Sequence, residues 1–183
     1  MLVWDPNTLE VDRDTCREVL RGRIVSAEVS VLSDGKKWTQ YGMYMPVRQH
    51  AAEEVQHAWD ALEASLAGTQ GEVMAGGDMN AETEAYLEAR GARLVDATLA
   101  DSLYNELIEE HGLVAQAEGA TYRAGTQIDN WLVSEELDGH MGRTRTLPGV
   151  CGKDHRVVIT EYFVGVEGAR DREERPAGIG ARM

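Results

Sequence analysis

"GGDMNAE", residues 76–82, follows the short apolar run of residues 73–75, and it has two interpretations. Turns favour Gly, Asp and Asn for local backbone reasons, so Asp78 and Asn80 can simply close a buried strand. The same carboxylate and amide can instead form one edge of a metal-dependent active site, because hard divalent cations bind oxygen ligands. The segment alone does not choose between the two, and the choice depends on the rest of the chain.

The composition indicates one acidic globular domain. The chain has 183 residues, of which 43% are hydrophobic, and this is enough to build an ordinary core. Its formal net charge of −14 repels phosphate backbones unless the few cations gather on one face or a divalent metal intervenes. General coating of nucleic acid is therefore disfavoured. A divalent-metal enzyme is compatible with this charge, because clustered carboxylates bind such a metal.

The sequence contains no signal for a membrane or for a disulfide framework. No apolar stretch reaches the length that spans a bilayer, and the early acidic residues Asp5, Glu10 and Asp12 do not fit a signal peptide. Cys16 and Cys151 are too few and too far apart for a four-cysteine zinc site, so free thiols are expected. We therefore expect an intracellular protein, cytoplasmic or nuclear, without membrane insertion.

Hydrophobic periodicity predicts a mixture of strands and helices. The predicted strands cover residues 22–32, 38–45, 94–95, 142–147 and 155–164, with a short strand from residue 72 and a hairpin over residues 121–134 whose second arm is 128–133. The predicted helices cover residues 49–67, 81–91 and 98–112. Beyond residue 166 charged residues mix with Gly and Pro, so we predict one domain over residues 1–166 and a disordered tail or linker over residues 167–183.

Polar side chains occur at the ends of three predicted strands. These are Asp78 with Asn80, then Asp129, then Asp154 with His155. Strand ends of a packed α/β domain can converge at one rim, where loops build a cleft. Each of these residues taken singly has a more common structural explanation: a turn cap, a local hydrogen bond or a solvated position. The hypothesis is that the five side chains gather around one anion pocket.

The order of four segments carries a resemblance to a known family. They are YGMYMP (41–46), GGDMNAE (76–82), TYRAGTQIDNWLVS (121–134) and GKDHRVV (152–158). They resemble successive motifs of the endonuclease/exonuclease/phosphatase superfamily, whose deoxyribonuclease I-like fold is shared by abasic-site endonucleases, inositol phosphatases and retrotransposon endonucleases. The resemblance covers roughly residues 3–165. It implies an α/β (α+β) four-layer sandwich, two mainly antiparallel sheets with outer helices, and a phosphoester-cleaving site at one rim.

The resemblance implies a role for each matched residue near the water and the metal. Asp78 would position or deprotonate the attacking water, and Asn80 would orient that water and hold the phosphate. Asp154, together with Asp78, would bind the divalent metal, and such oxygen ligands favour Mg²⁺ or Mn²⁺ over zinc.

Three further matched residues would contact or support the phosphate. His155 would donate to a phosphate oxygen, Asp129 would accept the proton of its other ring nitrogen, and Tyr44 would reach the phosphate. The nearby basic residues are the best candidates for steering a phosphate to this site: Arg143, Arg145, Lys153 and Arg156.

The chain departs from the family's pattern at its start. Members of the family usually begin with a strand that carries an asparagine and a further strand that carries a metal-binding glutamate, and neither precedes the first predicted hairpin. Glu10 and Glu28 do not simply inherit this role, because they lie on segments that match later parts of the fold. Gly42 stands where the family has an asparagine, and Thr126 where some relatives have an aromatic residue. We therefore expect missing N-terminal strands, uncovered sheet edges and self-association through those edges.

The first functional prediction is divalent-metal-dependent hydrolysis of phosphodiester bonds, endonuclease-like, on nucleic acid or another phosphoester. One alternative is a catalytically impaired remnant of the fold, retrotransposon-type in origin, that acts as an interaction module. Another is a phosphatase on small phosphorylated metabolites or lipids, which fits the net charge of −14 better. His50 and Glu54 lie one helical turn apart and could bind a metal, but a solvated helix face is the more common explanation.

Overall fold

The computed structural model describes residues 5–92, 94–151 and 154–163, and it is a mixed α/β fold with two sheets. The larger sheet contains, in spatial order, β1 (Leu9–Leu20), β2 (Ile24–Val31), β3 (Lys37–Tyr44), β4 (Val73–Asp78), β6 (Asp129–Ser134) and β5 (Leu113–Ala115). Of its neighbouring pairs only β3 and β4 run parallel. The smaller sheet is the antiparallel pair β7 (Arg145–Cys151) and β8 (His155–Ile159). The expected class, two mainly antiparallel sheets with helices, is confirmed.

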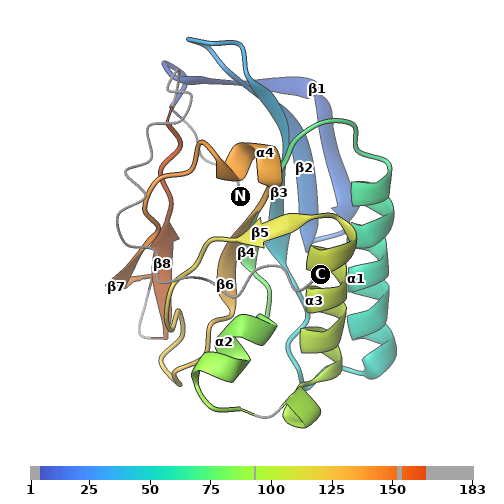
Figure 1. The fold of residues 1–183 in the computed structure, drawn as a ribbon. Coiled ribbons are helices and arrows are strands. Elements are labelled where there is room, and N and C mark those ends of the chain that lie inside the picture. The colour runs from blue at the N-terminus through green and yellow to red at the C-terminus, as the bar shows by residue number, and fades with distance from the viewer. Residues whose placement is uncertain (1–4, 93, 152–153, 164–183) are drawn as a thin grey trace, which may run out of the picture.

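The two longer helices and the small sheet cover opposite faces of the large sheet (Figure 1). The two longer helices, α1 (Ala52–Ala67) and α3 (Leu99–Glu110), lie side by side on one face. Shorter helical segments occur in the connections: α2 (Glu84–Ala89), the 3₁₀ helix η1 (Leu94–Asp96) and α4 (Glu135–Asp138). On the other face β8 packs against β6, where the indole nitrogen of Trp131 donates to the carbonyl of Val158 at 3.1 Å.

Each face of the large sheet buries its own hydrophobic core. Because side chains alternate along a strand, β3 directs Tyr41 and Met43 to one face and Trp38 to the other. The first core fills the space under α1 and α3, with Trp59 and Tyr104 in contact at 5.5 Å between ring centroids. The second core lies between the sheet and the segments around α4 and the small sheet. Burial on both faces fixes the register of the central strands, since a slip of one residue would exchange the two sets of side chains.

Four elements differ from the sequence predictions. β1 was not predicted, because it is a largely exposed edge strand rich in charged residues, and its pairing shifts between Asp12 and Arg17. The short β5 was also missed. Residues 94–95 belong to the 3₁₀ helix η1 and not to a strand. Residues 121–127 form turns with a single bridge to the start of β8 and not the first arm of a hairpin.

Several expectations concern the chain as a whole. The predicted tail, residues 167–183, lies outside the described residues, as does the C-terminal end of the predicted domain. No helix within the described ranges is long and apolar enough to cross a membrane. The expected self-association through sheet edges finds no support among the described residues.

Candidate active site

Three adjacent strands place Tyr44, Asp78 and Asp129 side by side. In the parallel pair β3–β4, Tyr44 is the register partner of Asp78. In the antiparallel pair β4–β6, Asp78 is the partner of Asp129. The ends of β3 and β4 and the beginning of β6 therefore meet at the same edge of the sheet, although the residues come from distant parts of the chain.

The two glycines before Asp78 allow β4 to pack closely against β3 and β6. Gly77 has φ +151°, and a Cβ atom at this position would lie 1.9 Å from the carbonyl oxygen of Met43 on β3. A Cβ atom on Gly76 would lie 2.5 Å from the ring of Trp131 on β6. The Gly-Gly pair is therefore a packing requirement of β4, and it brings Asp78 next to its neighbours on both sides.

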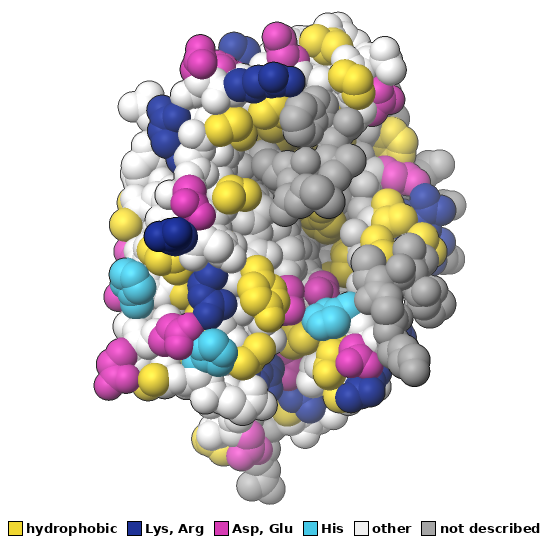
Figure 2. Space-filling model, turned by 180° about the vertical axis from the view of Figure 1, so that it is seen from behind, with side chains coloured by type: hydrophobic (Ala, Val, Ile, Leu, Met, Phe, Trp, Pro, Cys, Tyr) yellow, Lys and Arg dark blue, Asp and Glu magenta, His cyan; other side chains and the backbone are white. Residues whose placement is uncertain are grey.

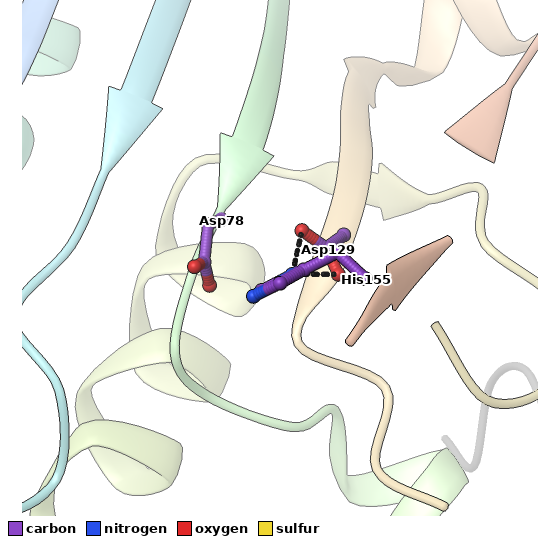
Figure 3. Close-up of side chains that lie close together, drawn as sticks. All are labelled: Asp78, Asp129 and His155. Atoms are coloured by element: carbon purple, nitrogen blue, oxygen red, sulfur yellow. Dashed lines mark hydrogen bonds and ion pairs between the residues drawn. The ribbon is translucent and has the colours of Figure 1, made fainter. Parts of the chain in front are cut away.

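Asp78, Asp129 and His155 form a compact cluster at this edge. One potential ligand atom of each residue lies within 4.8 Å of those of the other two. His155 begins β8, and its Nδ1 lies 3.1 Å from both carboxylate oxygens of Asp129. Figure 3 shows the other ring nitrogen pointing toward Asp78. Because an ionised carboxylate only accepts hydrogen bonds, this arrangement assigns the Nδ1 proton to the bond with Asp129 and leaves Nε2 on the Asp78 side.

The cluster changes the acidity of Asp78. Burial raises the pKa of the Asp78 carboxyl to about 6, and the negative charge of Asp129 adds to this effect. The backbone N–H of Asn80, 3.0 Å from Oδ1 of Asp78, and the nearby His155 act in the opposite direction and lower the pKa. A carboxylate with this pKa can accept a proton from a bound water near neutral pH.

Asn80 connects the turn after β4 to the end of β3. Its side-chain amide donates to the carbonyl of Met45 at 2.9 Å, and its backbone has φ +49°. Asn tolerates this left-handed conformation better than most residues, which is one reason that an asparagine occupies position 80. The buried Asn80 side chain therefore holds a fixed place beside Asp78.

Tyr44 is the exposed aromatic residue of the site, with 52% of its surface accessible. Its ring lies 6.0 Å from the guanidinium carbon of Arg23. That guanidinium also pairs with Glu54 at 2.6 Å, and Glu54 accepts in addition from His50 at 2.8 Å. The His50–Glu54 pair thus shares its carboxylate with an arginine, which favours the interpretation as a surface ion pair over a metal site.

Asp154 lies apart from the cluster. Its carboxylate pairs with the guanidinium of Arg123 at 2.9 Å, and its backbone carbonyl accepts from the N–H of Arg123 at 2.8 Å. Of the expected basic group around it, Arg145 pairs with Glu161, Arg156 donates to the carbonyl of Ala120 at 3.1 Å, and Lys153 lies outside the described residues. In Figure 2 the described Lys and Arg side chains are scattered over the face, while a histidine and acidic side chains lie close together.

Several residues that support the site were missed in the sequence. The buried hydroxyl of Thr121 accepts the backbone N–H groups of Ile128 and Asp129, both at 2.9 Å, and so fixes the start of β6. Tyr122 packs edge-on against His155, with 5.0 Å between ring centroids. Glu82 is fully buried and ion-paired. No local pattern distinguishes such residues from ordinary loop residues, because their partners are distant in sequence.

No protein-family model and no curated protein sequence matches this chain. Solved structures do match. The endonuclease domain of TRAS1, a telomere-specific non-LTR retrotransposon, superposes with a TM-score of 0.64 at 13% identity, over 85% of this chain and 66% of that one. The chain has the deoxyribonuclease I-like fold. The resemblance seen in the sequence is therefore confirmed as a shared fold.

Two further structures share this deoxyribonuclease I-like fold. The 3'-5' exonuclease NExo of Neisseria meningitidis is 17% identical, with a TM-score of 0.57, over 77% of this chain and 65% of that one. The AP endonuclease LMAP of Leishmania major is 14% identical, also with a TM-score of 0.57, over 75% and 53%. The chain thus spans between 53% and 66% of the lengths of these three structures.

Proposed function

We propose that this chain hydrolyses phosphodiester bonds of nucleic acid with the help of a divalent metal. The observation that carries the proposal is the cluster of Asp78, Asp129 and His155 at one edge of the sheet, beside the exposed ring of Tyr44. The fold adds support, since similar structures are those of a retrotransposon endonuclease, an exonuclease and an AP endonuclease. A retrotransposon-type origin is part of the proposal.

The donor set of the cluster fits a divalent cation. Two carboxylates and one imidazole come within 4.8 Å of one another, and carboxylate oxygens suit Mg²⁺ and Mn²⁺. The two carboxylates are the proposed ligands, so that Nε2 of His155 stays free to contact the phosphate. When bound, the cation would neutralise charge that develops on the phosphoryl oxygens.

Asp78 and Asn80 are the proposed residues that act on the water. With a pKa of about 6, Asp78 is mostly ionised at neutral pH and can accept a proton from the attacking water. Asn80 is fixed by its bonds to Met45 and Asp78, so its amide oxygen can orient the water or contact the phosphate from one position.

His155, Asp129 and Tyr44 are the proposed contacts on the phosphate side. His155 would donate from Nε2 to a non-bridging phosphate oxygen, while Asp129 holds the ring through Nδ1. Tyr44 would donate its hydroxyl to the phosphate or stack on a base. Asp154 remains the proposed additional metal ligand, and to bind a metal its carboxylate would have to leave Arg123.

The proposal is tested by incubating supercoiled plasmid with the chain in Mg²⁺ or Mn²⁺ and measuring nicking. We expect His155→Ala and Asp78→Ala to lower the rate at least about 100-fold, because each removes a group that acts on the reacting atoms. His57→Ala, on the exposed face of α1, is the control and should retain the wild-type rate. Nicking that persists in both site variants would exclude this assignment.

A second candidate is hydrolysis of phosphomonoesters on small molecules. It is favoured by the net charge of −14, which opposes long polyanions. The similar 3' phosphatase NExo, bound to a product DNA hairpin, supports phosphomonoester chemistry but not the small substrate. Competition assays separate the two: a small phosphorylated metabolite that inhibits nicking far below millimolar concentration favours the phosphatase. If calorimetry detects no Mn²⁺ binding at millimolar metal, the impaired remnant is the better description.

A further inference from the structure

A network of ion pairs around two buried carboxylates adjoins the candidate site through Asn80. Glu82, with 0% of its side chain exposed, accepts from Arg48 at 3.0 Å and from Arg90 at 2.8 Å through the same oxygen, Oε2. The guanidinium of Arg48 also reaches Oδ1 of Asp101 at 3.0 Å, and the backbone N–H of Glu82 donates to that oxygen at 2.7 Å. The two acidic and the two basic side chains balance in charge, as a buried carboxylate requires.

Arg48 joins this network to Asn80. Its Nε donates to the backbone carbonyl of Asn80 at 3.4 Å, while its Nη2 binds Glu82 and Asp101. One guanidinium therefore contacts the turn that follows Asp78 and the acidic pair behind it. The guanidinium of Arg90 also donates to Glu82. Among the described residues, however, Arg90 makes no hydrogen bond to Asn80.

Glu82 joins the same network to the strand that carries Asp129. Its second carboxylate oxygen accepts the backbone N–H of Gln127 at 3.4 Å, two residues before Asp129. Nearby, the N–H of Met79 donates to the carbonyl of Ile128 at 2.7 Å. Two hydrogen bonds, from Gln127 to Glu82 and from Met79 to Ile128, therefore join the segment after Asp78 to the segment before Asp129.

The backbone of Asn80 needs such support. A non-glycine residue with φ +49° persists where the surrounding bonds over-determine it. The side chain of Asn80 is bound to Met45, its N–H to Asp78 and its carbonyl to Arg48. Asp101 in turn is anchored at the start of α3, where it receives the N–H and the hydroxyl of Thr98 at 2.8 Å.

We propose that Arg48 and Glu82 are positioning residues for the hydrolysis, holding Asn80 and Asp129 at a fixed separation around Asp78. This inference rests on the proposed function and adds two residues to it that contact neither substrate nor metal. Arg48 acts through the carbonyl of Asn80, and Glu82 acts through Arg48 and the N–H of Gln127.

The kinetic test compares Arg48→Ala with Arg90→Ala, which removes an equivalent guanidinium from the same oxygen of Glu82. We expect Arg48→Ala to lower kcat about 10- to 100-fold with KM nearly unchanged, as supporting residues of a site do. Arg90→Ala should keep kcat within about 3-fold of wild type. Arg48→Lys should restore thermal stability more than kcat, because one ammonium does not reproduce the bonds of Nε and Nη2 together. Equal kcat losses in the two alanine variants, in proportion to their loss of Tm, would overturn the proposal.

A second measurement does not depend on activity. Amide hydrogen exchange, followed by NMR in the metal-free full chain, reports local opening at Asn80 and Gln127. Arg48→Ala should speed exchange at both amides at least about 10-fold more than Arg90→Ala does. If this difference appears while the wild type nicks no DNA, the positioning network stands and the proposed function fails. If the two variants exchange equally at these amides, the positioning role is excluded whatever the activity.

Discussion

His155 lies with Nδ1 3.1 Å from each carboxylate oxygen of Asp129, although 26 positions separate the two residues in the sequence. The bond orients the imidazole at the start of β8 and gives its other nitrogen a fixed direction toward Asp78 (Figure 3). A histidine on the surface without such a partner would rotate, and its contact with an anion would be weaker. The pair therefore holds the start of β8 and the start of β6 together beside Asp78.

Replacing Asp129 tests this pair. In Asp129→Asn the side chain keeps its size but loses its charge, and an amide can present either a donor or an acceptor to Nδ1. We expect kcat to fall about 100-fold with a small change in KM, because the ring loses its preferred tautomer and orientation. Asp60→Asn, on the exposed side of α1, is the control. A plasmid-nicking rate within a few-fold of wild type would show that the bond to His155 is dispensable.

The sequence predicted the centre of the site better than its surroundings. Asp78, Asp129 and His155 lie together as predicted from their places beside apolar runs, a property that a sequence displays locally, and their roles stay predictions. The edge strand β1 was missed because its exposed, charged residues lack an apolar period. Glu82 is part of the quoted turn segment, yet its identity gives no sign that it is fully buried, since burial depends on Arg48 and Arg90 from other elements.

The positions of the carboxylates relative to one another were the least predictable, and which of them bind a metal stays a prediction. Asp154 precedes His155 in sequence, but consecutive residues at the start of a strand point to opposite sides, and Asp154 pairs with Arg123 instead of joining Asp78. Asp129, expected only as the partner of His155, lies close enough to Asp78 to share a cation. Distances between strands decided both outcomes, and these distances follow from packing and not from local sequence.

The pKa of Asp78 predicts a dependence of stability on pH. Its value of about 6 in the folded protein exceeds the ordinary 3.8, so folding favours the neutral carboxyl. This contribution to stability is complete below about pH 3.8 and is lost as the pH rises through about 6. Asp78→Asn stays neutral at all these pH values. We therefore expect the Tm of the variant minus that of the wild type, both in EDTA, to increase between pH 4 and pH 7.5.

A divalent cation should act in the opposite direction. Bound Mn²⁺ favours the ionised Asp78, so at pH 7.5 it should raise the Tm of the wild type more than that of Asp78→Asn. Thermal melts at several Mn²⁺ concentrations measure this. Parallel Tm increases in both proteins would contradict the assignment of Asp78 as a ligand.

Gly77→Ala should destabilise the fold strongly. The added methyl would lie 1.9 Å from the carbonyl oxygen of Met43, and the backbone at φ +151° disfavours any side chain. Separation of β3 from β4 should lower the free energy of unfolding by about 3 kcal/mol. Gly35→Ala is the matched control, since its φ is +72° but no atom lies within 4 Å, and it should cost only about 1 kcal/mol. Urea denaturation of both variants gives the comparison, and equal losses would show that the contact with β3 is not the cause.

Thr121→Val removes the hydroxyl that fixes the start of β6 while it keeps the shape of the side chain. The N–H groups of Ile128 and Asp129 then lose their acceptor in a buried environment, at a cost of about 2 kcal/mol or more. Thr121→Ser retains the oxygen and should lose about 1 kcal/mol through the missing methyl group alone. Chemical denaturation of both variants separates the cost of the lost hydrogen bonds from the cost of the lost methyl group. If the serine variant is as unstable as the valine variant, packing and not hydrogen bonding explains the buried threonine.

The ion pair between Arg123 and Asp154 allows a direct test of Asp154 as a metal ligand. The Arg123 side chain is 64% exposed and that of Asp154 is 41% exposed, so solvent screens the pair and opening it costs little. If Asp154 binds the cation, Arg123→Ala should tighten Mn²⁺ binding about 2- to 5-fold, since the carboxylate no longer has a competing partner. Asp154→Asn should weaken binding by a larger factor. Arg145→Ala, which releases Glu161 instead, controls for the loss of one positive charge. Calorimetric titration with Mn²⁺ measures all four proteins, and an Asp154→Asn protein that binds like the wild type would leave the cation to Asp78 and Asp129.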